Sequence, residues 1–184
     1  MVSSGDATKS VPTSGSDGPF AAAIQSHQAG KLDEAADGYR KLLRSDPNHA
    51  AAHANLGQVL GTLGQVKEAE LQYQQALQLN DREAGVWFNY GNLLRRQNRI
   101  AEAVDAYRQA LTIDPGFIEP HLNLAHALRR KGDFADAVEN YRAFLERRAN
   151  HAEALEGLAR SLQSIGQLAD AVATFEAAVA AGVA

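Results

Sequence analysis

One stretch of the sequence decides the fold: AGVWFNYGNLLRRQNRIAEAVDAYRQALTIDPGF, residues 84–117. Its first half carries apolar or small residues at the spacing i, i+3, i+4 and i+7, namely Trp87, Tyr90, Gly91 and Leu94. Its second half repeats this spacing with Ala103, Tyr107, Ala110 and Leu111. Such spacing is typical of one apolar face of a helix. We therefore predict two helices, at residues 84–96 and 101–112, joined by a short turn.

The same pattern returns every 34 residues from Phe20 onward. An alanine marks each copy, at Ala35, Ala69, Ala103, Ala137 and Ala171. An aromatic residue follows four positions later, at Tyr39, Tyr73, Tyr107, Tyr141 and Phe175. A helix breaker precedes each alanine by five positions, at Gly30, Gly64, Asn98, Gly132 and Gly166. Glycine, or asparagine in its place, suits the left-handed residue after a helix C-terminus. A strict period favours a stacked solenoid over an ordinary helical bundle.

Composition narrows the class of protein further. The chain has 184 residues and a formal net charge of −4, which argues against nucleic acid or an anionic membrane as the main partner. It has no cysteine, which excludes disulfides, thiolate nucleophiles and cysteine zinc sites. No apolar run approaches the ~18 residues of a membrane span. We expect an all-α cytoplasmic protein.

The first eighteen residues differ from the rest in composition. Residues 1–18 are rich in Ser, Gly, Thr and Asp and contain no aromatic residue. Such a segment buries too little apolar surface to offset its ordering entropy. We predict a disordered tail at 1–18 and a repeat domain at 19–184, with units at about 16–49, 50–83, 84–117, 118–151 and 152–184.

The repeated residues resemble a known family. Trp87-x2-Tyr90-Gly91-x2-Leu94, followed by Ala103-x3-Tyr107-x2-Ala110 and Pro115, is similar to the tetratricopeptide repeat, or TPR. The other units match more loosely, and Pro19 shortens the pattern of the first helix in the first unit. The resemblance implies a right-handed α-solenoid of about five helix-turn-helix units. It also implies that the first helix of each unit lines a concave groove.

The polar stripe opposite the core of each first helix predicts the residues of that groove. The candidate peptide-binding residues are Asn55, Gln58, Asn89, Asn92, Arg96, Asn123, His126 and Arg130. Three of them, Asn55, Asn89 and Asn123, recur at the 34-residue interval, and a carboxamide can bond both N–H and C=O of a peptide backbone. This row resembles the asparagine ladder in the repeats of O-linked N-acetylglucosamine transferases. The alternative is that asparagine is simply a common polar residue of an exposed helix face.

Basic residues lie at the end of the same stripe. Arg96 and Arg130, beside Asn92 and His126, indicate a preference for partners that carry carboxylates. The alternative is that each arginine complements the dipole at its helix C-terminus, a contribution of ~0.3–1 kcal/mol. We leave both explanations open at this stage.

The sequence gives little support for a catalytic or metal site. His49-x3-His53 has the spacing of a two-ligand helical site, but His53 and His121 occupy the position of Trp87 and are expected to pack. We predict no cofactor, no metal and no enzyme activity. The predicted function is a protein-interaction scaffold that binds an extended peptide or protein segment. The alternative is the substrate-recognition part of a larger glycosyl- or sulfotransferase whose catalytic domain is absent from this chain.

The last helix predicts a second kind of contact. Val172, Phe175 and Val179 would have no following helix to cover them. We expect self-association through this C-terminal edge, while nucleic acid and membranes are not expected as partners.

Overall fold

The computed structural model describes residues 18–182, which form ten α-helices and no strand. The helices are α1 (Pro19–Gln28), α2 (Leu32–Ser45), α3 (Ala50–Thr62), α4 (Val66–Leu79), α5 (Ala84–Arg96), α6 (Ile100–Ile113), α7 (Ile118–Lys131), α8 (Phe134–Leu145), α9 (Ala152–Ser164) and α10 (Leu168–Ala180). The predicted helices 84–96 and 101–112 are thus α5 and α6, the second longer by one residue at each end. The all-α solenoid is confirmed. Residues 1–17, nearly all of the predicted tail, lie outside the described residues.

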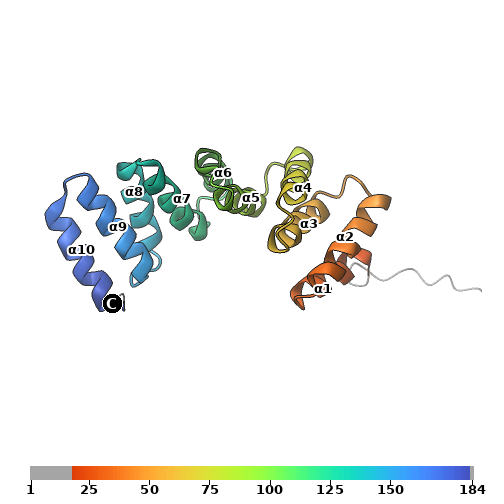
Figure 1. Cartoon of the computed structure of the whole chain (residues 1–184), viewed down its shortest axis with the longest axis horizontal. Coiled ribbons are helices and arrows are strands. Elements are labelled where there is room, and N and C mark those ends of the chain that lie inside the picture. Colours follow the sequence, from red (N-terminus) through yellow and green to blue (C-terminus); the bar gives the residue numbers. More distant parts are fainter. Residues whose placement is uncertain (1–17, 183–184) are drawn as a thin grey trace, which may run out of the picture.

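The helix pairs follow one another along an arch (Figure 1). Its orange end holds α1 and α2, and its blue end holds α9 and α10. The odd-numbered helices, which are the first helices of their units, lie on the inner side of the arch. A polar stripe on these helices therefore shares one face of the molecule.

Each pair turns through a left-handed residue, as the sequence predicts. The φ angles are positive at Gly30 (73°), Gly64 (77°), Asn98 (63°), Gly132 (94°) and Gly166 (79°). Glycine adopts this region without a Cβ clash, and asparagine tolerates it better than most other residues. The departure from glycine in the third unit therefore preserves the turn.

The core is built from the repeated alanine and tyrosine. Tyr39, Tyr107 and Tyr141 are fully buried, and the alanines at the repeat position are buried beside them. The core falls into two clusters, one over α1–α5 and one over α5–α10. Tyr90 of α5 packs against both clusters, and its hydroxyl donates to Glu70 of α4 at 3.3 Å. The seam between the two clusters is therefore held by α5.

Glycines on the inner helices allow the tyrosine rings to approach the backbone. A Cβ built on Gly91 would lie 2.7 Å from Cε1 of Tyr107. Gly157 has the same role for Tyr141, whose Cζ would be 2.4 Å from the added carbon. Any larger residue at either position would have to displace the tyrosine ring.

The two ends of the repeat array differ from its middle. Helix α1 has ten residues and starts at Pro19, where the missing N–H costs nothing because the first turn leaves it unpaired. On α10, Leu168, Val172 and Val179 are each more than half exposed, while Phe175 is half-buried. Within residues 18–182, the helices are too short or too polar for any to cross a membrane.

Candidate functional site

All eight candidate residues lie on three successive inner helices. Helix α3 carries Asn55 and Gln58, α5 carries Asn89, Asn92 and Arg96, and α7 carries Asn123, His126 and Arg130. Gln58, Arg96 and Arg130 are exposed to solvent. The asparagines and His126 are half-buried, so the asparagines do not lie on a freely exposed helix face.

Two of the asparagines, Asn92 and Asn123, form a network with a tyrosine of α6. The hydroxyl of Tyr107 donates to Oδ1 of Asn92 at 2.8 Å, and Nδ2 of Asn123 donates to the same oxygen at 2.7 Å. The inner face thus carries a hydrogen-bonded amide network joined to the buried core. Burial raises the pKa of Tyr39, and the amide of Asn55 partly opposes that shift.

Arg96 and Arg130 connect neighbouring inner helices. Nη1 of Arg96 donates to the carbonyl oxygen of Gly61 in the last turn of α3 at 3.1 Å. Nη2 of Arg130 donates to Oδ1 of Asn98, just beyond α5, at 2.6 Å. Each cation therefore lies at the C-terminal end of the preceding inner helix, where it is electrostatically favourable.

A basic pocket of about 260 Å³ opens between α5, α7 and α9. Its lining residues are Arg95, His126, Arg129, Arg130, Glu153, Glu156, Gly157 and Arg160. Four guanidinium groups thus face two carboxylates, of which Glu156 pairs with Arg160 at 2.7 Å. The pocket has a net positive charge.

Arg95 and Arg129 are functional candidates that the sequence reasoning left out of the site. Both are half-buried, and their Nε atoms are buried without a hydrogen-bond partner in the described part of the chain. Burial raises the pKa of Tyr107 and of Tyr141, and the adjacent Arg95 and Arg129 respectively oppose this shift. The available signal was the Arg-Arg pair that recurs after one repeat.

His126 lies at the edge of this pocket. Its ring packs on that of Tyr141 at 5.4 Å between centroids, and its Nδ1 is 3.8 Å from Oε1 of Glu153. Burial lowers the pKa of His126, while the charge of Glu153 acts in the opposite direction and Arg129 and Arg95 lower it further. His126 is therefore neutral at neutral pH and adds no charge to the pocket.

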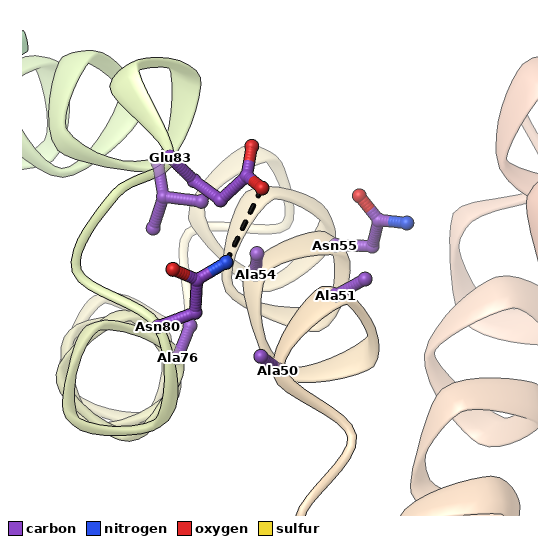
Figure 2. Close-up of a pocket in the computed structure, with 8 residues that line it drawn as sticks. Ala50, Ala51, Ala54, Asn55, Ala76, Asn80 and Glu83 are labelled. Atoms are coloured by element: carbon purple, nitrogen blue, oxygen red, sulfur yellow. Dashed lines mark hydrogen bonds between the residues drawn. The ribbon is translucent and has the colours of Figure 1, made fainter. Parts of the chain in front are cut away.

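A second pocket, of about 270 Å³, lies at the junction of α3, α4 and α5 (Figure 2). It is lined by Ala50, Ala51, Ala54, Asn55, Ala76, Asn80, Glu83 and Val86. Nδ2 of Asn80 donates to Glu83 at 3.2 Å, and this pair forms a polar rim above the alanines (Figure 2). The lining is otherwise small and mostly apolar.

The second pocket exists because Ala54 is small. The equivalent positions in three other units are Phe20, Phe88 and Leu122. The Phe88 ring packs against Phe117 at 5.1 Å between centroids and against Tyr107 at 6.0 Å. An alanine at this position leaves empty the space that a large apolar side chain fills one repeat later.

Comparison with known sequence families shows to which family the chain belongs. Profiles described as "Tetratricopeptide repeat" match residues 56–116 and 122–182, and another of that description matches 94–139. A profile described as "TPR repeat" matches residues 26–64. The chain belongs to the tetratricopeptide repeat family.

Solved structures have the same TPR architecture. A crystal structure of MamA is 19% identical with a TM-score of 0.80, covering 86% of this chain and 93% of MamA. YrrB, reported as a TPR protein with an unusual peptide-binding site, is 19% identical with a TM-score of 0.81, covering 89% and 84%. PilF of Pseudomonas aeruginosa is 27% identical with a TM-score of 0.75, covering 90% and 76%. No curated protein sequence matches the chain significantly.

Two histidines of this TPR chain, His49 and His53, have structural roles. Nδ1 of His49 accepts the N–H of Ala52 at 3.2 Å and so caps α3. The ring nitrogens of His53 lie 2.7 Å from the side-chain amide of Gln72 and 2.9 Å from the carbonyl of Pro47. The i, i+4 spacing of these histidines thus reflects one cap and one packed ring. Residues 18–182 contain no cluster of three or more His, Asp or Glu that could hold a metal ion.

Proposed function

We propose that this TPR chain is a scaffold that binds an extended segment of a partner protein along the inner face of its arch. One observation carries the proposal: amides on α3, α5 and α7 form a row with a pocket at each end. The pocket at Ala54 is apolar, and the pocket at Arg129 is basic. The peptide-binding site reported for the structurally similar YrrB supports the same role.

The chemistry of the row suits a peptide backbone. Each carboxamide offers two N–H donors and one acceptor oxygen, which match the C=O and N–H groups of an extended chain. Because Asn123 donates to Asn92, which also accepts from the core residue Tyr107, these amides are held in place before a ligand arrives. Groups that are already ordered lose less entropy on binding.

The pocket at Ala54 would receive an apolar side chain of the segment. Its volume is that left by the missing phenylalanine, so an aromatic or large aliphatic residue fits its shape. Burial of such a side chain contributes about 1.5–3 kcal/mol. The segment is therefore expected to gain affinity from one apolar side chain in this pocket, while the amides of the inner face bind its backbone.

Selection of random linear peptides displayed on phage tests this function. Peptides recovered on the wild-type chain are titrated against the double variant Asn55→Ala, Asn89→Ala. A net worth of ~0.5–1.5 kcal/mol per hydrogen bond, with one bond lost at each asparagine, predicts binding about 5- to 150-fold weaker. Gln109→Ala on α6 removes an exposed amide from an outer helix and serves as the matched control. Equal affinity of wild type and double variant, with unchanged melting curves, would contradict the role of the amides.

We also propose that the exposed apolar side of α10 contacts a second copy of the chain. Leu168, Val172 and Val179 are 60%, 58% and 67% exposed, which is unusual for three large apolar residues of one helix. Light scattering is expected to give a mass that rises with concentration in the wild type but not in Val172→Glu. A constant monomer mass in both chains would refute the contact. We place the scaffold in the cytoplasm and assign it no catalytic step.

A further inference from the structure

We infer that the basic pocket between α5, α7 and α9 is the subsite for an acidic side chain, aspartate or glutamate, within the bound segment. The inference rests on the proposed peptide binding and adds the chemistry of one ligand residue to it. Arg95 and Arg129 are the groups that would hold the carboxylate. Both come from inner helices, one repeat apart.

The first argument is the state of these two arginines. Some arginines of the described chain have acidic partners, such as Arg108 with Asp136 and Arg148 with Glu119. Arg95 and Arg129 form no ion pair with residues 18–182, and their Nε atoms are buried without a partner. A buried Nε–H group without an acceptor is unfavourable, and a carboxylate matches the planar fork of a guanidinium in a bidentate manner. Two such groups on one pocket wall therefore favour an anionic ligand.

The second argument is a change between neighbouring repeats. In the third unit the hydroxyl of Tyr107 donates to Asn92, and Asn123 completes the network. One repeat later these two amide positions are His126 and Gly157. The hydroxyl of Tyr141 is accordingly buried without a hydrogen-bond partner. The amide network is thus interrupted at the place where the pocket opens.

Gly157 lets Tyr141 approach the wall of the pocket. A Cβ at this position would lie 2.5 Å from the Tyr141 hydroxyl and 2.4 Å from its Cζ, so no side chain fits without moving the ring. The tyrosine ring therefore packs directly on the backbone of α9 at a residue that lines the pocket.

Two carboxylates also line the pocket. Glu153 is two-thirds exposed and Glu156 is paired with Arg160, so both lie on the α9 side of the pocket. A phosphorylated residue carries about −1.5 to −2 charges at neutral pH, so both its attraction to the arginines and its repulsion by these glutamates exceed those of a single carboxylate. A comparison of phosphoserine with aspartate peptides separates the two ligands.

The test compares acidic and neutral peptides on matched variants. A peptide selected on the wild-type chain is expected to contain Asp or Glu, and its replacement by Asn or Gln is expected to weaken binding about 10- to 150-fold. On the double variant Arg95→Gln, Arg129→Gln, the acidic and neutral peptides should bind equally. Arg108→Gln on α6 is the control, and it should keep the preference. If the double variant fails to fold, Arg129→Lys keeps the charge, loses the fork and should reduce the preference only in part.

Other outcomes overturn the inference in different ways. Loss of binding on C-terminal amidation of the peptide would assign the pocket to a terminal carboxylate. Enrichment of phosphoserine over aspartate would assign it to phosphate. Selected peptides without acidic residues, whose binding still depends on Asn55 and Asn89, would refute the acidic subsite and leave the peptide-binding function standing. If binding depends neither on an acidic residue of the peptide nor on Asn55 and Asn89, the proposed peptide-binding function is refuted as well.

Discussion

Replacing Gly91 by alanine tests how tightly the inner and outer helices of one repeat are packed. The new methyl carbon would lie 2.7 Å from Cε1 and 2.8 Å from Cδ1 of Tyr107. Carbon atoms in ordinary contact are about 3.5–4.0 Å apart, so the ring must move by about 1 Å. Tyr107 is fully buried, and its hydroxyl donates to Asn92 at 2.8 Å. The ring therefore has no free direction in which to move.

Two opposing contributions set the expected size of the effect. Overpacking of a buried site costs about 1–3 kcal/mol. Alanine in place of glycine within a helix contributes about 0.8–1 kcal/mol in the favourable direction. Gly85 lies in the same helix with nothing within 4 Å of its added Cβ, so Gly85→Ala isolates the favourable part. The free energy of unfolding of Gly91→Ala should fall below that of Gly85→Ala by about 1–3 kcal/mol.

The assay is chemical and thermal unfolding followed by circular dichroism. For a domain of this length, 1 kcal/mol corresponds to about 2–4 °C in melting temperature. Gly61→Ala provides an intermediate case, since its Cβ would meet Leu93 at an ordinary 3.6 Å. The expected order of stability is Gly85→Ala and Gly61→Ala above Gly91→Ala. Equal stability of all three variants would show that Tyr107 can move freely, and the packing argument would be wrong.

Three further predictions concern the inner face. Ala54→Phe should fill the pocket at α3–α5, since Phe88 fills the equivalent space one repeat later. The melting temperature should stay unchanged or rise, and peptides with an apolar anchor should no longer bind; if they still bind, the anchor lies elsewhere. Asn123→Ala should lower the free energy of unfolding by about 0.5–1.5 kcal/mol through its lost hydrogen bond, whereas exposed Gln58→Ala should stay within about ±0.5, as urea titrations can check. Burial lowers the pKa of His126 from 6.5, so as the pH falls the imidazole is protonated in the unfolded chain before it is protonated in the folded chain. Its contribution to stability is present above about pH 6.5 and is lost as the pH falls through the lowered pKa, and melting curves of His126→Gln should show a weaker decline over that range.

The sequence predicts the helices and turns well because both depend on local, repeated chemistry. The spacing from Trp87 to Leu94 marks a helix face wherever it occurs, and the residue at position 98 must accept a positive φ to reverse the chain. A period kept over five units removes the ambiguity that a single short pattern would leave. The bounds of α5 and α6 were accordingly correct within one residue.

The side-chain detail of the inner face was harder to predict. A helical stripe places Arg96 and Arg130 on the inner face but says nothing of where long side chains end. Both reach back to the preceding helix, while Arg95 and Arg129, one position earlier, line the basic pocket. The network of Asn92 and Asn123 depends on Tyr107 of another helix, which no single-helix pattern contains.

The apolar pocket at Ala54 lies beside α5, where the two core clusters meet, so a ligand in it would affect how the arch bends. The pocket at Ala54 is lined from α3 and α4 on one side and from Glu83 and Val86 on the other, so it lies at the boundary between the second and third units, and Val86 packs against the α1–α5 cluster. Any flexing of the arch at this boundary widens or narrows the pocket. A side chain seated there acts as a wedge that fixes one curvature, and the entropy lost by the arch then becomes part of the binding free energy. Ligand binding in this pocket and the stiffness of the arch are therefore coupled. A chain with phenylalanine at position 54 would form a stiffer arch even without ligand.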